Sequence, residues 1–527
     1  MPVNRLLYLL LLLAPALRLP ATTPQTVAEH ILSQLYQTNG NFKFKKPGLV
    51  ITPENKKVAA YVPSKNTIYI DEKVYGICRS FGRDSLSALA FIIGHELAHA
   101  FQSEIRENKF RTNFLAYDKN YSLDIQVEKV ADIQGIFNAY VAGYNVMTVT
   151  PLLIDQIYTE YGLKGKNLPG YPSLEARKGS CAEALAVAEN LIDVFEASNY
   201  LLVIGKPSLA GTGYEYILQY YQGREIYNNI GLSYALSAQD YWDPATDHFL
   251  YPMEADWQSK IDRSVSARGM EKADAEMVPL RNLLLLKAEA AFKDAIQSDP
   301  SYIPAKINLV CVLDMLSRPE EALRFYDKNL SGYVKGKSKI KNQQQQLAEL
   351  ALGITYALLP DAVQKAAAAK IFKDLEQSSS SLVALYGRVN GQNMKRDMAY
   401  GNDVPDFQLP EMFRQLVYDM TLPRTADLTR LSINQDLGIS FLKKHESETS
   451  TFVFANNGGN IVSLIKFKNR RAKNVSIFSE GGNLEQELYH NIVAAKDGFY
   501  LKSPGDKVVL KIDGKGRVLE MVRYFEH

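Results

Sequence analysis

The chain has 527 residues, which is more than one hydrophobic core normally serves, so we expect two to four domains. Its apolar content of 46% and charged content of 22% are ordinary for a folded protein. The net charge of +2 provides no polybasic signature, so composition gives no support for a nucleic-acid partner.

The N-terminus is the one strongly apolar segment. Arg5 precedes a leucine-rich run over 6–13, and small alanines and a polar stretch follow. This is the order of a secretory signal peptide, which we place at residues 1–21, with an uncleaved anchor as the alternative. We therefore expect a periplasmic or secreted protein, with no transmembrane helix after signal cleavage.

The next segment predicts a helix within 22–44 and then short strands at 49–52, 58–62 and 67–70. We expect these strands to form a small antiparallel sheet. An edge strand of such a sheet can hold an extended peptide by backbone pairing. The strand around 68–70 is our candidate for that edge.

A His-Glu-Leu-Ala-His motif follows at 95–99, after the apolar run 89–93. Residues i and i+4 of a helix lie on one face, so His95 and His99 can bind one zinc ion. Glu96, next to the first histidine, can act on a metal-bound water. The three cysteines (Cys78, Cys181 and Cys311) form no CxxC pattern, so a metal must be held by histidines and carboxylates.

A zinc site of this kind needs a third protein ligand, and the downstream candidate is Glu128. Glu128 and Asp132 are again i and i+4 in a segment that predicts a helix. One carboxylate can bind the metal while the other accepts a hydrogen bond from a ligand histidine. The alternative is an ordinary solvated helix face.

With these motifs the sequence resembles the gluzincin metallopeptidases of the HtpX and CAAX-prenyl-protease family. The resemblance covers about residues 60–180 and includes Glu128-Lys129-Val130-Ala131-Asp132, on a predicted helix that runs into Ala142-Gly143-Tyr144. It also includes Pro172, Ser173 and Arg177, but Tyr171 stands where the family carries a histidine. Its soluble, signal-bearing subgroup with tetratricopeptide repeats (BepA-like) acts in envelope protein quality control.

The resemblance implies a zincin-like metallopeptidase domain over 22–180 that binds one Zn²⁺ per chain. The implied metal ligands are His95, His99 and Glu128. Glu96 would be the catalytic general base, and Asp132 would orient a ligand histidine. Arg177 would organise the site or bind the developing oxyanion. Tyr171 would donate to that oxyanion, or would be an ordinary loop aromatic.

Residues 181–395 read as almost entirely helical. Ala288, Phe292, Ala295 and Pro300 follow the spacing of a tetratricopeptide repeat, and Ala322 and Tyr326 match one 34-residue period later. We predict tetratricopeptide-like repeats that bind a protein partner, with generic helical hairpins as the alternative. A linker over 396–426 and a small C-terminal β domain over 427–527 follow, with strands at 451–454, 461–465, 475–478, 508–512 and 518–522.

The expected fold class is therefore multidomain α+β: a metallopeptidase domain, a helical repeat domain and a β domain. The leading functional hypothesis is an extracytoplasmic zinc endopeptidase that cleaves protein or peptide substrates. The alternative is a non-catalytic repeat scaffold or chaperone with a structural zinc site. An intact Glu96 argues against that alternative, since a structural site does not require it.

Overall fold

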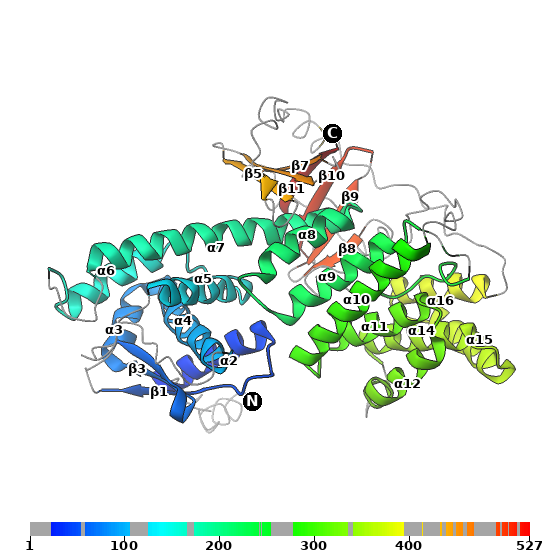
Figure 1. The fold of residues 1–527 in the computed structure, drawn as a ribbon, viewed down its shortest axis with the longest axis horizontal. Helices are drawn as coiled ribbons and strands as arrows, with labels where there is room; N and C mark the ends of the chain where they lie inside the picture. Colours follow the sequence, from blue (N-terminus) through cyan, green and yellow to red (C-terminus); the bar gives the residue numbers. More distant parts are fainter. Residues whose placement is uncertain are drawn as a thin grey trace, which may run out of the picture. The chain divides into compact units, whose positions relative to one another are not determined.

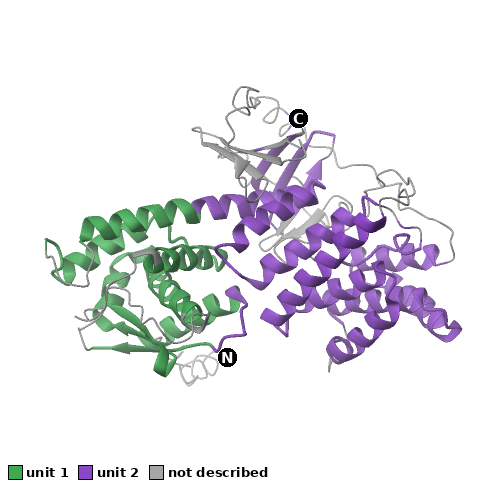
Figure 2. Ribbon diagram, viewed as in Figure 1, with its two compact units in different colours: residues 1–38, 46–188 green, residues 39–45, 189–527 purple. Residues whose placement is uncertain are grey.

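The computed structural model describes residues 23–53, 58–105, 125–165, 173–241, 243, 245–253, 278–335, 341–394, 414, 433–434, 439–445, 449–456, 461–467, 492–495, 498–503, 505–513 and 517–526. The signal segment 1–21, Tyr171, all of the linker except residue 414 and the predicted strand 475–478 lie outside these ranges. The chain divides into two compact units (Figure 2), residues 1–38 with 46–188, and residues 39–45 with 189–527.

The first unit begins with α2 (Pro24–Asn39) and a sheet of β1 (Gly48–Thr52), β2 (Ala59–Val62) and β3 (Thr67–Asp71). The sheet order is β1-β3-β2, with β1 parallel and β2 antiparallel to β3. The expectations of an all-antiparallel sheet and of an edge strand at 68–70 are therefore wrong. The side chain of Gln25 on α2 hydrogen-bonds Leu49 O and Ile51 N–H of β1, which leaves β2 as the other edge.

Helices complete the first unit: α3 (Glu72–Ser80), α4 (Ser85–Ile105), α5 (Ile125–Val141), α6 (Thr150–Glu160) and the first part of α7 (Leu174–Val203), with short 3-10 turns at Pro63–Lys65 and Gly82–Asp84. Every residue of α4 from 87 to 100 is buried. A helix that is apolar on all sides belongs in a core, as the run before the motif predicted. Helix α7 runs without a break across the boundary predicted at 180.

The second unit is largely helical, which confirms the helical prediction for 181–395 at that level. Its helices are α8 (Pro207–Leu218), α9 (Arg224–Ala238), α10 (Val278–Ser298), α11 (Ile303–Met315), α12 (Pro319–Asn329), α13 (Ser331–Val334), α14 (Gln343–Leu358), α15 (Ala362–Glu376) and α16 (Ser381–Asn393). Successive helices pack on one another (Figure 1), and the repeat positions Ala288, Phe292, Ala322 and Tyr326 are buried. The tetratricopeptide assignment itself stays a prediction.

The C-terminal part of this unit forms a sheet, in agreement with the predicted β segments that the structure describes. Its strands are β4 (Ile433–Asn434), β5 (Ile439–His445), β6 (Thr449–Asn456), β7 (Ile461–Phe467), β8 (Ile492–Ala495), β9 (Gly498–Ser503), β10 (Val508–Ile512) and β11 (Val518–Glu526). The order is β4-β5-β6-β7-β11-β10-β9-β8, with antiparallel neighbours throughout the described strands.

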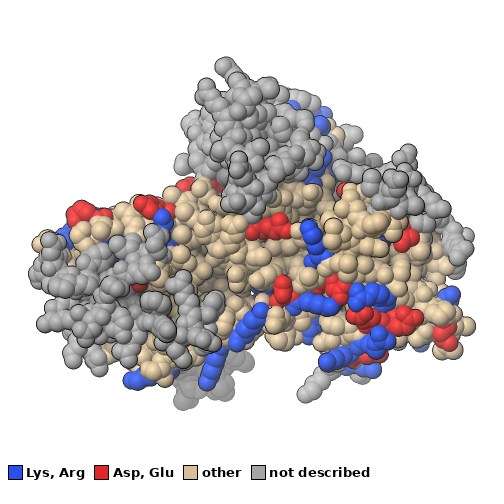
Figure 3. Space-filling model, viewed as in Figure 1, with Lys and Arg blue, Asp and Glu red and all other residues tan. Residues whose placement is uncertain are grey.

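Surface charge on the helical part is mixed. On the face drawn in Figure 3, basic and acidic side chains lie side by side over these helices rather than gathering by sign. Arg318 of the α11–α12 turn illustrates this, because it pairs with both Glu289 and Glu321. Within the part of the chain that the structure describes, no helix combines the length and apolar character needed to cross a bilayer.

Candidate metal centre

Two glycines bring the motif helix α4 against α5. A Cβ built on Gly135 of α5 would lie 2.7 Å from His95 N and 2.8 Å from the carbonyl carbon of Gly94. Real Cβ atoms do not approach backbone that closely, so only glycine permits this contact. The close approach places the histidine-bearing face of α4 directly on the carboxylate-bearing face of α5. Sequence reasoning missed this contact, although glycine inside a helical pattern is a recognised signal for it.

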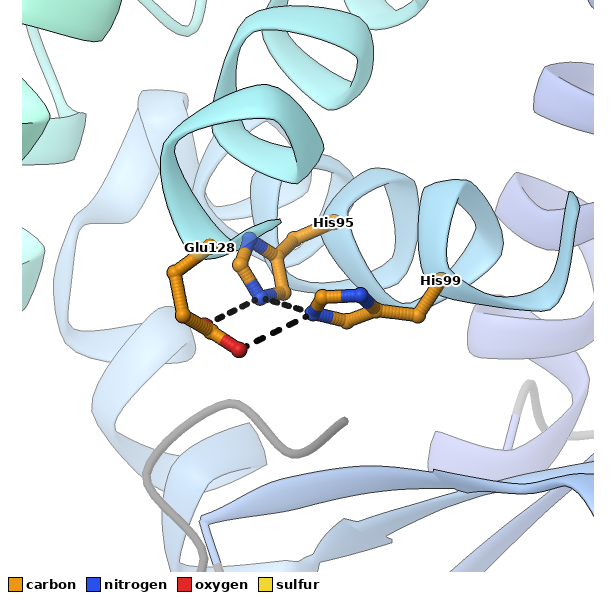
Figure 4. Close-up of side chains that lie close together, drawn as sticks. All are labelled: His95, His99 and Glu128. Atoms are coloured by element: carbon orange, nitrogen blue, oxygen red, sulfur yellow. Dashed lines mark hydrogen bonds and ion pairs between the residues drawn. The ribbon is translucent and has the colours of Figure 1, made fainter. Parts of the chain in front are cut away.

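Three side chains from the two helices converge at this crossing (Figure 4). The Nε2 atoms of His95 and His99 lie 3.0 Å apart, and Glu128 places its two oxygens 3.2 Å from the first and 3.4 Å from the second. A tetrahedral zinc ion with bonds of about 2.0–2.2 Å separates its ligand atoms by roughly 3.3–3.6 Å. The observed separations lie close to that range, so this buried group could hold a metal ion.

The electrostatics of the group favour a cation. Burial alone would lower the pKa of His95, but hydrogen bonds to Asp132 and Glu128 raise it to about 9. Burial alone would raise the pKa of Glu128, but the charge of His99 and the hydrogen bond with His95 hold it below its ordinary value. The site therefore stabilises positive charge among the histidines, and a proton and a metal ion compete for the same nitrogen atoms.

Asp132 and Arg177 support His95 from behind. Asp132 Oδ1 lies 2.7 Å from His95 Nδ1, and Arg177 approaches both carboxylate oxygens of Asp132, with Nη2 2.9 Å from Oδ1 and Nη1 bonded to Oδ2. In a neutral His95 ring whose Nδ1–H donates to Asp132, Nε2 carries the lone pair, and this lone pair faces Glu128. Burial raises the pKa of Asp132, but the Arg177 charge outweighs this and lowers it, so the carboxylate stays ionised.

Glu96 lies outside the group of three and faces the sheet. Its side chain is fully buried, and its Oε2 accepts a hydrogen bond of 2.7 Å from the backbone N–H of Tyr61 on the edge strand β2. In an antiparallel pair, an N–H that points away from the neighbouring strand is available on the outer side. The outer side of β2 at Tyr61 therefore meets the motif helix, and β2 replaces the strand at 68–70 as the edge beside the site.

Comparisons with protein-family models, with curated proteins and with solved structures each found no match. The chemistry of the site must therefore be judged from its own side chains.

Of the residues predicted for the site, the structure brings six together: His95, Glu96, His99, Glu128, Asp132 and Arg177. Tyr171 lies outside the described residues. Arg177 is 4% exposed and directs its guanidinium at Asp132, a contact that sequence reasoning did not foresee. His99 Nδ1 is buried and has no hydrogen-bond partner among the described residues, so only His95 has an orienting carboxylate there.

Proposed function

We propose that the chain is a zinc-dependent endopeptidase. The observation that carries this proposal is the buried convergence of His95, His99 and Glu128, with Glu96 one residue along the same helix. Zinc accepts nitrogen and oxygen ligands of these kinds. A tetrahedral ion takes four ligands, so three protein donors leave one coordination position for a further group. Zinc bound there supplies a Lewis acid that lowers the pKa of a water and polarises a carbonyl.

The residues of the chain supply the remaining chemistry. Glu96 accepts the proton of the attacking water and later delivers it to the leaving amine, which is the work of a general base and acid. Asp132, ion-paired with Arg177, accepts a hydrogen bond from His95 Nδ1 and so directs Nε2 of that ring toward the metal position. The backbone N–H of Tyr61 on β2 holds Glu96 through a hydrogen bond of 2.7 Å and so fixes the position of this carboxylate beside the metal group.

The location and the substrate belong to the same proposal. The leader-like segment 1–21 supports an extracytoplasmic enzyme, and the helical second unit supports a protein substrate or partner in envelope protein quality control. The resemblance to gluzincins of the HtpX and CAAX-prenyl-protease family supports the peptidase chemistry through the same residues. The alternative is a non-catalytic scaffold with a structural zinc site. Cleavage by the Glu96→Gln protein distinguishes it from the endopeptidase.

The decisive experiment replaces Glu96 by Gln and follows cleavage of an unfolded protein. Loss of a general base lowers the rate by about 10²- to 10⁴-fold, while zinc content stays at one per chain. Glu72→Gln, on the exposed start of α3, is the matched control and should cleave normally. Full cleavage by the Glu96→Gln protein would sink the peptidase proposal.

The ligand set is tested separately by zinc content. Glu128→Ala removes the only carboxylate of the three-residue group and should leave the purified protein with little zinc. The circular dichroism of the variant shows whether it remains folded. An unchanged zinc content in a folded Glu128→Ala protein would remove Glu128 from the ligand set.

A further inference from the structure

The two histidines of the metal centre share a helix, a degree of burial and a common carboxylate. His95 and His99 stand one turn apart on α4, and both side chains are fully buried. Their rings meet edge to face with centroids 4.6 Å apart, and the Nε2 atom of each faces Glu128 (Figure 4). Helix, burial and the shared carboxylate therefore do not distinguish the two residues.

The difference lies at the other ring nitrogen. His95 Nδ1 lies 2.7 Å from Asp132 Oδ1, and Arg177 Nη2 holds that oxygen from behind at 2.9 Å. His99 Nδ1 is also buried, but it has no hydrogen-bond partner in the described part of the chain. A neutral histidine that binds a metal through Nε2 carries its proton on Nδ1. In His99 that N–H is a buried donor without an acceptor.

This difference makes one ring harder to move than the other. A hydrogen bond to an ionised carboxylate is among the stronger ones in proteins, and turning the His95 ring would break such a bond. Turning the His99 ring breaks no hydrogen bond at Nδ1. A buried donor without an acceptor also costs free energy, and His99 bears this cost as long as its Nε2 serves as a ligand.

The backbone adds a second restraint at His95. A Cβ built on Gly135 would lie 2.7 Å from His95 N, and one built on Gly94 would lie 3.0 Å from Gly135 O. The backbone of α4 at His95 is therefore packed directly on α5. His99 lies one turn, about 6 Å, further along α4. His95 is thus held both at its backbone and at its ring.

We propose that His99 is the yielding ligand of the metal centre. On loss of the metal, His99 lets go first while His95 and Glu128 stay in place, and on uptake His99 is the last to bind. The inference rests on the ligand set of the proposed function and adds its regulation. A site that opens at one ligand exchanges its ion readily, so zinc supply outside the cytoplasm sets the fraction of endopeptidase that is loaded.

Two matched variants test the inequality. His95→Ala and His99→Ala each remove the same side chain from a fully buried position on α4. Contacts behind a ligand are worth about 10- to 100-fold in metal affinity, so His95→Ala should lose at least tenfold more zinc affinity than His99→Ala. Chelator competition measures the affinity, and circular dichroism checks the fold. Equal losses, or a larger loss in His99→Ala, overturn this inference but leave the ligand set of the endopeptidase standing.

The cause is tested by removing the contact behind His95. Asp132→Leu with Arg177→Met replaces the buried ion pair by apolar side chains, a change that is often tolerated. In this background His95→Ala and His99→Ala should lower zinc affinity to within about twofold of each other, which is the scatter of independent substitutions. A tenfold gap that persists in this background would overturn the proposal, because Asp132 would then not be its cause.

A second measurement needs no substitution and serves if a variant fails to fold. Protein with isotope-labelled histidine is followed by NMR as zinc is added. Of the two rings whose signals shift, one should show the far-downfield Nδ1–H proton of a hydrogen bond to a carboxylate, and the other should not. Two such protons overturn the inequality of the ligands alone. If no ring shifts, the ligand set itself is wrong, and the proposed function fails together with this inference.

Discussion

The contact between α4 and α5 can be tested by giving Gly135 a single methyl group. In Gly135→Ala the new Cβ would stand 2.7 Å from His95 N and 2.8 Å from the Gly94 carbonyl carbon. Ordinary contacts begin near 3.4 Å, so the helices must separate by about 0.7 Å. Overpacking of this kind costs about 1–3 kcal/mol, against a gain of about 0.5–1 kcal/mol from replacing a helical glycine by alanine. The net effect is a loss of stability of about 0–2.5 kcal/mol.

The same displacement acts on metal binding. Glu128 sits on α5 and the histidines on α4, so moving the helices apart by about 0.7 Å exceeds the roughly 0.2 Å tolerance of a zinc site. We expect zinc affinity to fall at least tenfold, measured by competition with a coloured chelator, together with a lower unfolding temperature. Gly76→Ala in α3 is the control, because nothing lies within 4 Å of its added Cβ, and it should be neutral or stabilising. A Gly135→Ala protein with unaltered zinc affinity and stability would refute the reasoning.

Three further predictions follow from individual contacts. Asp132→Asn leaves the buried Arg177 without its counter-charge and weakens the orientation of His95, so zinc affinity should fall about 10- to 100-fold by chelator competition. Asp155→Asn, at a side chain that is 39% exposed, should not change the zinc affinity. Chelation of zinc should lower the unfolding free energy by about 3 kcal/mol relative to protein with free zinc at 100 times the dissociation constant; Glu128→Ala should show no such response in calorimetry. Burial holds the pKa of Asp314 well above 3.8, so its contribution to stability is full below that pH and is lost as pH rises through the folded-state pKa. Urea unfolding of Asp314→Asn between pH 4 and 8 should therefore lose that part of the pH dependence, and an unchanged slope would contradict the assignment.

The parts of the metal centre that lie within one helix could be predicted from the sequence. His95 with His99, and Glu128 with Asp132, share a face because their spacing is local, and helix geometry fixes it. The approach of the two helices was not predicted. It depends on Gly94 and Gly135 meeting across the core, and glycine within a helical pattern signals a close approach but not its partner.

The ion-pair partner of Arg177 could not be predicted from the sequence either. A long side chain from a third helix can reach several groups, and only the packing of α7 shows that Arg177 pairs with Asp132. The predicted antiparallel direction of β1 in the small sheet was also wrong. The apolar pattern of this strand is the same whether its neighbour runs parallel or antiparallel. Residues 246–253, between α9 and α10, carry no periodic pattern, so nothing in the sequence indicated the hydrogen bonds between the Leu250 backbone and Asn390 of α16.

Helix α7 bears on how this protein could be divided. It has 30 residues and a length of about 45 Å, and its first turns carry Arg177 while its end belongs to the second unit. A gene fragment that stops near codon 180 would leave this arginine on a helical remnant too short to stay folded alone. The metal centre is therefore expected to be expressed and exchanged together with the whole of α7, so that a workable cut falls after Val203.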